Sequence, residues 1–517
     1  MNRVVMVAMT GAFTLAVGGV PPVFAQGSAA SGGAGGAAQG LTLPLSGRPG
    51  QAGSVSVVQT ALPGASSSVN TASPTVQAQG AATGSRNGAT PLTGPLGFRD
   101  AVERGLAWNL GTVSVAQTVR QARSQQVLAR SALLPTIGAD LAATRQQLNL
   151  AASGFGSIGS PLPGFNFPSV VGPFTVVDLR ARLSQSVVDV TSWKNFKAAR
   201  EGAAAAQWTN EDARDLVVLA VGGSYLQALA ARARVESARA QVQTAEALFR
   251  QTAERKAAGV AAQVDVDRSE IQALTQRQRL TALVNDLAKQ KIALARMVGL
   301  PPTDAYDLAE PVAFAPAPAT TPEAAVTLAR ERRADLKSAA AQVRAAELAL
   351  AAARSERLPT VSVSGDYGTL GSSLANGRTT FSVAGRVHVP VFDGGRTGAH
   401  VQQAEAVVAQ RRAELEDLAG QIEADIRRAL LDLGAATSQV ELARRNVTVT
   451  KEALDLTRQR FEAGVAESLE VVQAQEAVAT AELDYINGVF AHNLSKLALA
   501  RATGEADERL ADYLKLP

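Results

Sequence analysis

The feature that most constrains this 517-residue chain is an internal duplication. Leu134-Pro135-Thr136 recurs 224 residues later as Leu358-Pro359-Thr360, and Ala258-Gly259-Val260 recurs 205 residues later as Ala463-Gly464-Val465. The smaller second offset places about 20 extra residues in the first copy, in a Gly- and Pro-rich stretch typical of a loop. Such self-similarity predicts one supersecondary unit used twice. The expected parts are a first repeat at 96–300, a Pro-rich linker at 301–321, a second repeat at 322–505 and a tail at 506–517.

The N-terminus has the pattern of an export signal. One positive charge precedes an apolar or small run over 4–20, and Val23-Phe24-Ala25 supplies small or medium residues where a signal peptidase reads. This pattern predicts a secretory signal peptide at 1–25. A membrane anchor is the alternative, which the break at Pro21-Pro22 disfavours.

The next segment, 26–95, consists mainly of Gly, Ala, Ser, Gln and Pro with hardly any charge. It predicts a disordered leader, because such a composition buries too little apolar surface to offset the entropy of ordering. No further apolar run of about 18 residues is expected, and hence no transmembrane helix. Any membrane span would then consist of strands.

Each repeat contains a stretch that alternates between apolar and polar residues. Leu179 and Leu183 alternate with Arg180 and Arg182 in the first copy, and Arg386 lies on the polar side of the second. Period two over about ten residues predicts a strand with one lipid face and one wet face. The three arginines are therefore expected to line a water-filled lumen. A half-buried strand in a soluble sandwich is the alternative, but nothing else in the chain supplies sandwich partners.

After each alternating stretch the period becomes seven. One larger and one small residue per heptad predict closely packed coiled-coil helices. The helix expected at 190–256 would be about 100 Å long, and shorter helices are expected at 99–133 and 264–298. In the second copy the larger residues of the heptads are Ile426, Leu433, Val440, Val447, Leu454 and Phe461.

The composition excludes several functions. With 50 Lys+Arg against 46 Asp+Glu, the charge is too even for a nucleic-acid binder. The absence of cysteine excludes disulfides, thiolate sites and a lipidated N-terminal Cys. The three histidines follow no ligand pattern, and no GxSxG, HExxH or P-loop motif occurs. We therefore expect no catalytic residue, cofactor or metal site, and no enzyme activity.

Two hairpins supply four strands, which cannot close a barrel. Open sheet edges are not tolerated in hydrocarbon, and natural closed barrels have about eight strands or more. The chain must therefore close its barrel with other copies of itself, in a head-to-tail ring. The expected fold class is mostly α with transmembrane β, in which the strands continue into a tube of long helices.

The double repeat resembles the TolC-type outer-membrane efflux proteins. The residues that carry the resemblance are Arg460-Phe461-Glu462-Ala463-Gly464-Val465, Pro390-Val391-Phe392-Asp393 and the Leu-Pro before a strand in each copy. The resemblance implies a homotrimer with a twelve-stranded barrel in outer-membrane lipid and an α-barrel in the periplasm. It also implies a periplasmic adaptor protein and an inner-membrane pump of RND, ABC or MFS type. The cargo would be small molecules or, in a type I secretion system, proteins.

Two further expectations concern the ends of the long helices. Gly259 and Gly464 lie where a helix must reverse, which favours positive φ. The resemblance implies that these turns dock the adaptor, through Ala258, Gly259, Val260, Ala463, Gly464 and Val465. It also implies a periplasmic gate at Glu470, six residues after Gly464, and at Asp265 in the first copy. The family's second acidic position is Gln473 here, so one acidic ring is missing.

Two other classes of protein are alternatives to an outer-membrane exit channel, or duct. A structural coiled-coil surface protein or adhesin would explain the heptads but not the amphipathic hairpins. A periplasmic enzyme or binding protein would need pocket chemistry that the sequence does not show.

Overall fold

The computed structural model describes the chain in segments. These are residues 54–61, 72–86, 92, 94–150, 152, 168–303, 306–310, 314–317 and 320–506. The expected signal peptide at 1–25 lies outside the described residues, as does the tail beyond 506.

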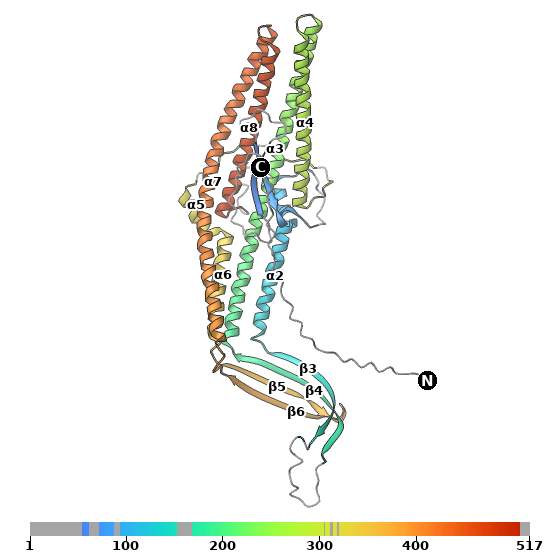
Figure 1. The fold of residues 1–517 in the computed structure, drawn as a ribbon, viewed down its shortest axis with the longest axis vertical. Coiled ribbons are helices and arrows are strands. Elements are labelled where there is room, and N and C mark those ends of the chain that lie inside the picture. Colours follow the sequence, from blue (N-terminus) through green and yellow to red (C-terminus); the bar gives the residue numbers. More distant parts are fainter. Residues whose placement is uncertain are drawn as a thin grey trace, which may run out of the picture. The chain divides into compact units, whose positions relative to one another are not determined.

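The same six elements occur twice in the same order (Figure 1). The first set is α1 (Phe98–Trp108), α2 (Leu110–Ser131), β3 (Thr136–Asn149), β4 (Val170–Val188), α3 (Val190–Ala257) and α4 (Gln263–Val298). The second set is α5 (Pro322–Arg332), α6 (Ala334–Ser355), β5 (Thr360–Gly371), β6 (Arg378–His388), α7 (Arg396–Glu462) and α8 (Ser468–Thr503). The duplication seen in the sequence is thus a duplication of structure.

The helix expected over 99–133 is broken at Asn109, so that expectation is wrong. Asn109 has extended backbone angles and caps α2 by accepting a hydrogen bond from the Gly111 amide at 2.8 Å, while its Nδ2 donates to the Met297 carbonyl at 3.2 Å. Arg333 breaks the second copy at the matching position, and its guanidinium donates to the Ala502 carbonyl at 3.4 Å. In both copies, therefore, the residue at the break holds the last turn of the returning helix.

The helices form a layer whose neighbours change along its length. In Figure 1 the upper part runs α7, α8, α3, α4, and the lower part runs α7, α6, α3, α2; each neighbouring pair is in contact. The long helices α3 and α7 take part in both halves. The linker joins this layer because the Glu310 carboxylate accepts a hydrogen bond from the first amide of α1, that of Phe98, at 2.9 Å.

The predicted heptad positions form the packed interior. Ile426, Leu433, Val440, Leu454 and Phe461 are buried on α7, and Val447 is half-buried. The expectation that no further long apolar run exists is wrong, because α3 contains an 18-residue window of mean hydropathy 1.4. That window is 89% buried inside the protein, so its apolar character belongs to the core.

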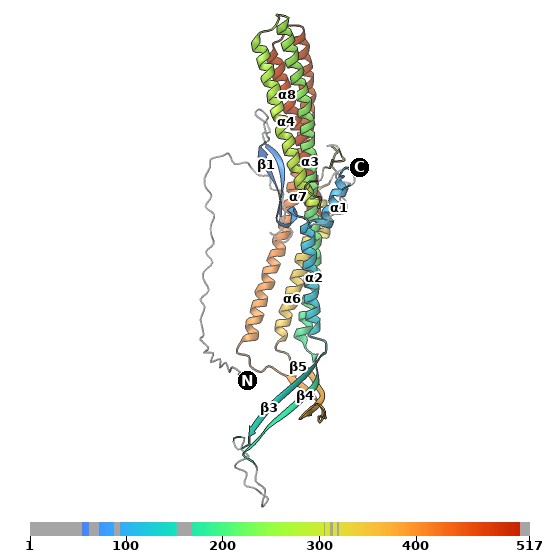
Figure 2. The same cartoon turned by 90° about the vertical axis from the view of Figure 1, so that its right-hand side faces the viewer.

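Part of the expected leader is ordered, which corrects the prediction of disorder over 26–95. β1 (Ser54–Ala61) and β2 (Ala72–Gln79) form an antiparallel pair, followed by the short 3-10 helix η1 (Gly80–Thr83). The Val76 amide donates to Oε1 of Gln227 at 3.0 Å, and Figure 2 shows β1 beside the helices. This docking onto α3 is a tertiary contact, which cannot be predicted from local composition.

Candidate functional site: the sheet faces and the helical tips

The four long strands form one antiparallel sheet in the order β3-β4-β5-β6. Arg182 lies opposite Asp366, which lies opposite Ser382 on the far strand. Because side chains alternate along each strand, this register places the predicted arginines Arg180, Arg182 and Arg386 on one face. The register therefore shows that the arginines of both copies share one face of the sheet; that this face lines a lumen stays a prediction.

Charged pairs cover that polar face. The Arg180 guanidinium contacts Asp366 at 2.5 Å and Asp178 at 3.2 Å, and Arg182 contacts Asp140 at 3.3 Å. The Ser382 hydroxyl donates to the other oxygen of Asp366. A face of hydrogen-bonded ion pairs needs water or a polar lumen beside it, because uncompensated charge is costly in hydrocarbon.

The opposite face is apolar and exposed. Exposed apolar patches of this kind mark surfaces that meet a partner or a membrane. The residues are Ile137 and Leu141 on β3, Leu179 and Leu183 on β4, Tyr367 on β5, and Phe381, Val383 and Val387 on β6.

A short motif repeats where each second strand meets its long helix. Val187-Val188-Asp189 and Val391-Phe392-Asp393 place two exposed apolar side chains before an aspartate, and Phe392 is 91% exposed. Asp189 accepts from the Ser192 amide at 2.9 Å. Hydrogen bonds from Thr397 and from the Gly395 amide lower the pKa of Asp393 to about 2. The aspartates therefore fix the first turns of α3 and α7, directly after the exposed apolar residues.

The turns between α3 and α4 and between α7 and α8, here called the tips, have the predicted geometry. Gly259 has φ 77° and Gly464 has φ 76°, a left-handed conformation that side-chain-bearing residues rarely adopt. Val260 and Val465 follow them and are 74% and 71% exposed. The two apolar side chains are thus presented outward by turns that only glycine accommodates readily.

The predicted gate carboxylates lie beside these tips, each with a partner. Glu470 completes a capping box at the start of α8 with Glu467, and it contacts Arg460 at 3.2 Å. Asp265 accepts from the Ser468 hydroxyl at 2.7 Å. Asp265 therefore contacts the first residue of α8, two positions before Glu470.

A second contact between the tips was missed by sequence reasoning. The Arg255 guanidinium lies 4.4 Å from the centroid of the Phe461 ring and donates to the Glu462 carbonyl at 2.9 Å. Together with the bond between Asp265 and Ser468, it joins the α3–α4 hairpin to the α7–α8 hairpin. No local motif signals this pairing, because its partners are about 200 positions apart.

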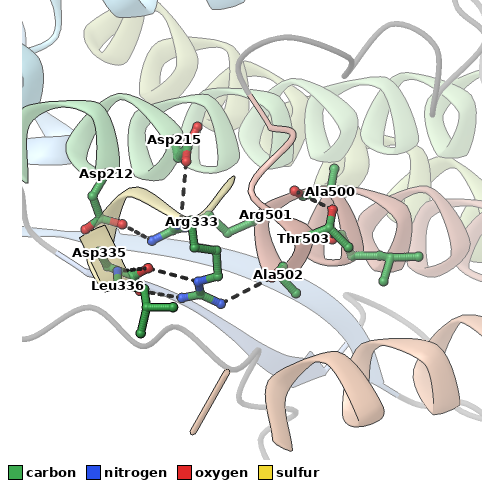
Figure 3. A network of polar contacts seen from close by, with 10 residues as sticks. Asp212, Asp215, Arg333, Asp335, Leu336, Ala500, Arg501, Ala502 and Thr503 are labelled. Carbon is green, nitrogen blue, oxygen red and sulfur yellow. Dashed lines mark hydrogen bonds and ion pairs between the residues drawn. The ribbon is translucent and has the colours of Figure 1, made fainter. Parts of the chain in front are cut away.

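A buried charge cluster also escaped prediction (Figure 3). Arg501 near the end of α8 contacts Asp212 and, at 3.5 Å, Asp215 of α3, while Arg333 contacts Asp335 at 2.6 Å. Burial alone would raise the pKa of Asp335, but the hydrogen bonds from Arg333 outweigh it, so the pKa is lowered. The cluster ties α3, the α5–α6 break and the end of α8 together. The equivalent of Arg501 in the first copy, Arg296, is exposed, so the duplication alone does not signal it.

A family model described as outer membrane efflux protein matches residues 112–300 and 325–505, which is more than half of the chain. The chain belongs to this family.

Individual relatives agree with the assignment. The chain is 28% identical to the pyoverdine export outer membrane protein OpmQ of Pseudomonas aeruginosa, over 75% of this chain and 80% of OpmQ. It is 26% identical to the outer membrane protein OprJ of the same species, over 79% of this chain and 84% of OprJ. Among solved structures, the outer membrane protein VceC of Vibrio cholerae matches with a TM-score of 0.66 and 19% identity, covering 79% of this chain and 96% of VceC.

Family membership confirms the fold class and the general function inferred from the sequence. Outer membrane efflux proteins are homotrimeric channels that work with a periplasmic adaptor and an inner-membrane pump, and they are channels rather than known enzymes. This chain is accordingly an outer-membrane exit channel that extends into the periplasm, with a mostly helical fold and a four-stranded contribution to a barrel.

Proposed function

We propose that this channel exports small organic molecules and that its role is transport without catalysis. The observation that carries the proposal is the two-sided sheet, with ion pairs on one face and exposed apolar side chains on the other. The polar face, with Arg180, Arg182 and Arg386, lines the lumen, and the apolar face meets lipid. Relatives named for pyoverdine export and toluene efflux support a small-molecule cargo.

Closure of the channel uses the two edges of the helical layer. α4 and α7 lie at opposite edges of its upper part (Figure 1), and each exposes apolar residues at helical spacing. In a head-to-tail trimer, α7 of one copy packs beside α4 of the next. The exposed residues are Val264, Ile271, Leu274, Val284 and Ile292 on α4, and Leu431, Leu442, Val449 and Leu456 on α7.

The tips dock the adaptor. The supporting observation is that both turns, at Ala258, Gly259 and Val260 and at Ala463, Gly464 and Val465, present an exposed valine on a rigid reversal. A pump of RND, ABC or MFS type then supplies cargo from the inner membrane, and the signal peptide at 1–25 directs export of the chain.

Glu470 and Asp265 form the periplasmic gate. Three-fold symmetry gathers three copies of each carboxylate about one axis, where like charges repel unless they are bridged. Arg460 and Ser468 supply partners within each chain. Glu470→Ala should raise the resting conductance of the purified channel in a planar bilayer. Wild-type conductance and wild-type block by divalent cations would assign Glu470 to helix capping alone.

The proposal is tested by deleting the chromosomal gene and complementing it with variants. Wild-type protein should restore tolerance to small toxic compounds, whereas Val260→Arg with Val465→Arg should not, although its trimer level in the outer membrane stays normal. Exposed Arg239→Gln on α3, which is not an edge helix of the layer, is the control and should complement fully. Full tolerance with the double valine variant would contradict tip docking, and failure of the wild-type protein to alter any export would contradict the duct.

A further inference from the structure

The β1–β2 hairpin and helix α1 pack on opposite faces of α3. The hairpin meets α3 where a Cβ added to Gly223 would lie 3.0 Å from a methyl group of Val76, and the Val76 amide donates to Oε1 of Gln227 at 3.0 Å. Helix α1 meets α3 at Val221 and Tyr225. At about 100° per residue, positions 223 and 227 lie about 200° around the helix from positions 221 and 225. Figure 2 shows the two elements on opposite sides of the long helices.

Helix α1 shares its face of the helical layer with the inter-repeat linker. Leu96, just before α1, forms a parallel bridge with Leu308, whose carbonyl accepts a hydrogen bond from the Arg232 guanidinium of α3 at 2.5 Å. Helix α5 belongs on the same face, because it contacts α7 and α8 as α1 contacts α3 and α4, and both repeats run from the sheet to the tip. Each chain thus places two short helices and the linker on one face, and the hairpin on the other.

The width of the tube decides which face is inside. In the described part of the chain, four helices form the wall at either level. Three chains with about 10 Å between neighbouring axes form a ring of about 19 Å radius, whose free space has a radius of about 14 Å. Helices are about 10–12 Å wide, so two helices and a linker from every chain would fill that space and leave no path. The α1 face is therefore the outer face of a conducting tube, and the hairpin lies in the lumen.

The sequence of the hairpin suits a strand pair between a wall and water. Alternation along β2 places Val76 on the face that meets α3, together with Ala72, Pro74 and Ala78. The opposite face of β2 carries Ser73, Thr75, Gln77 and Gln79, of which Gln79 is exposed. Neither strand contains a charged residue. One face of β2 is thus apolar and docked, and the other is polar and uncharged.

We propose that the three β1–β2 hairpins of the trimer form a constriction inside the helical tube. Gly223, where the hairpin docks, is at the middle of α3 (Val190–Ala257), so the constriction lies midway between the sheet and the tips. A strand pair with its side chains is about 10 Å thick, so three of them reduce a free radius of about 14 Å to about 4 Å. Because the free face is uncharged, the passage selects cargo by width. This proposal rests on the channel function above and adds an element that determines its specificity.

Cross-linking of single-cysteine variants tests the placement, because the natural chain has no cysteine. Gln79→Cys marks the hairpin, and Glu103→Cys, at an exposed position of α1, is the matched control on the other face. Three-fold related sites are at most about 24 Å apart inside the lumen and at least about 42 Å apart on the outer surface.

A bismaleimide with a reach of about 25 Å spans only the lumenal distance. It should join chains of the purified Gln79→Cys trimer into covalent dimers and leave chains of the Glu103→Cys trimer unjoined. A monofunctional maleimide measures the labelling of each cysteine. No covalent dimer in Gln79→Cys, or equal cross-linking of the two variants, would overturn the proposal.

Export measures the narrowing. Gln79→Trp adds a bulky side chain to the constriction and should lower tolerance to an exported compound at least four-fold, at a normal trimer level in the outer membrane. Glu103→Trp should restore tolerance as the wild-type protein does. Full tolerance with Gln79→Trp would overturn the constriction. The cross-link needs no transport, so failure of this proposal and failure of the export function are distinguishable.

Discussion

Replacing Val383 by Arg tests the two-sided sheet most sharply within the barrel. Val383 is the central residue of β6 (Arg378–His388), on the exposed apolar face, so it is expected near the bilayer midplane. Arginine on the lipid face at that depth costs about 2–4 kcal/mol per chain, or about 6–12 kcal/mol for a trimer that carries three copies. Such a cost should deplete the membrane-inserted trimer severely.

The neighbouring residue is the matched control. Ser382 lies on the polar face, where its hydroxyl contacts Asp366, so Ser382→Arg places a cation beside an existing carboxylate. That variant should assemble close to normally. The assay is the amount of heat-modifiable trimer in the outer-membrane fraction. Equal loss in both variants, or no loss in Val383→Arg, would refute the assignment of the faces.

Three further predictions concern stability. Burial, with the charge of Lys496 nearby, lowers the pKa of His492 to about 4. The free energy of unfolding is therefore at its full value above pH 6.5 and falls as the pH drops towards 4, by at most about 3 kcal/mol, because the unfolded chain then binds a proton that the folded protein does not. His492→Phe should therefore flatten the fall in apparent melting temperature between those pH values, and an unchanged pH profile would contradict this. Arg501→Met leaves Asp212 and Asp215 buried without their cation and should cost about 3–5 kcal/mol in denaturant unfolding, whereas a cost below about 1 kcal/mol would contradict the cluster's role. Gly464→Ala, at φ 76°, should cost about 1 kcal/mol or more in the same measurement, and a neutral or stabilising effect would show that the turn is not constrained.

Much of the fold could be predicted from the sequence because its main signals are local and repeated. Heptad spacing predicted the buried positions of α7 from Ile426 to Phe461, and strict alternation predicted that Arg180 and Arg182 share a face. The positive φ of Gly259 and Gly464 followed from the need to reverse a long helix. Each of these features depends on residues close together in the chain.

The parts that were missed depend on contacts between distant segments. The break at Asn109 is held by the Met297 carbonyl, and β2 is held by Gln227 of α3. The tip contact between Arg255 and Phe461 and the pairing of Arg501 with Asp212 each join different repeats. Local propensity carries no information on such partners, so a helix break appeared as continuous helix and an ordered hairpin as leader.

The central claim is that the polar face of the sheet lines the pore. It is tested most directly by single-channel recording of the purified trimer in a planar bilayer under a salt gradient. Arg182→Glu with Arg386→Glu should keep a conducting channel and move its reversal potential towards cation selectivity. A double variant with wild-type selectivity would contradict the account.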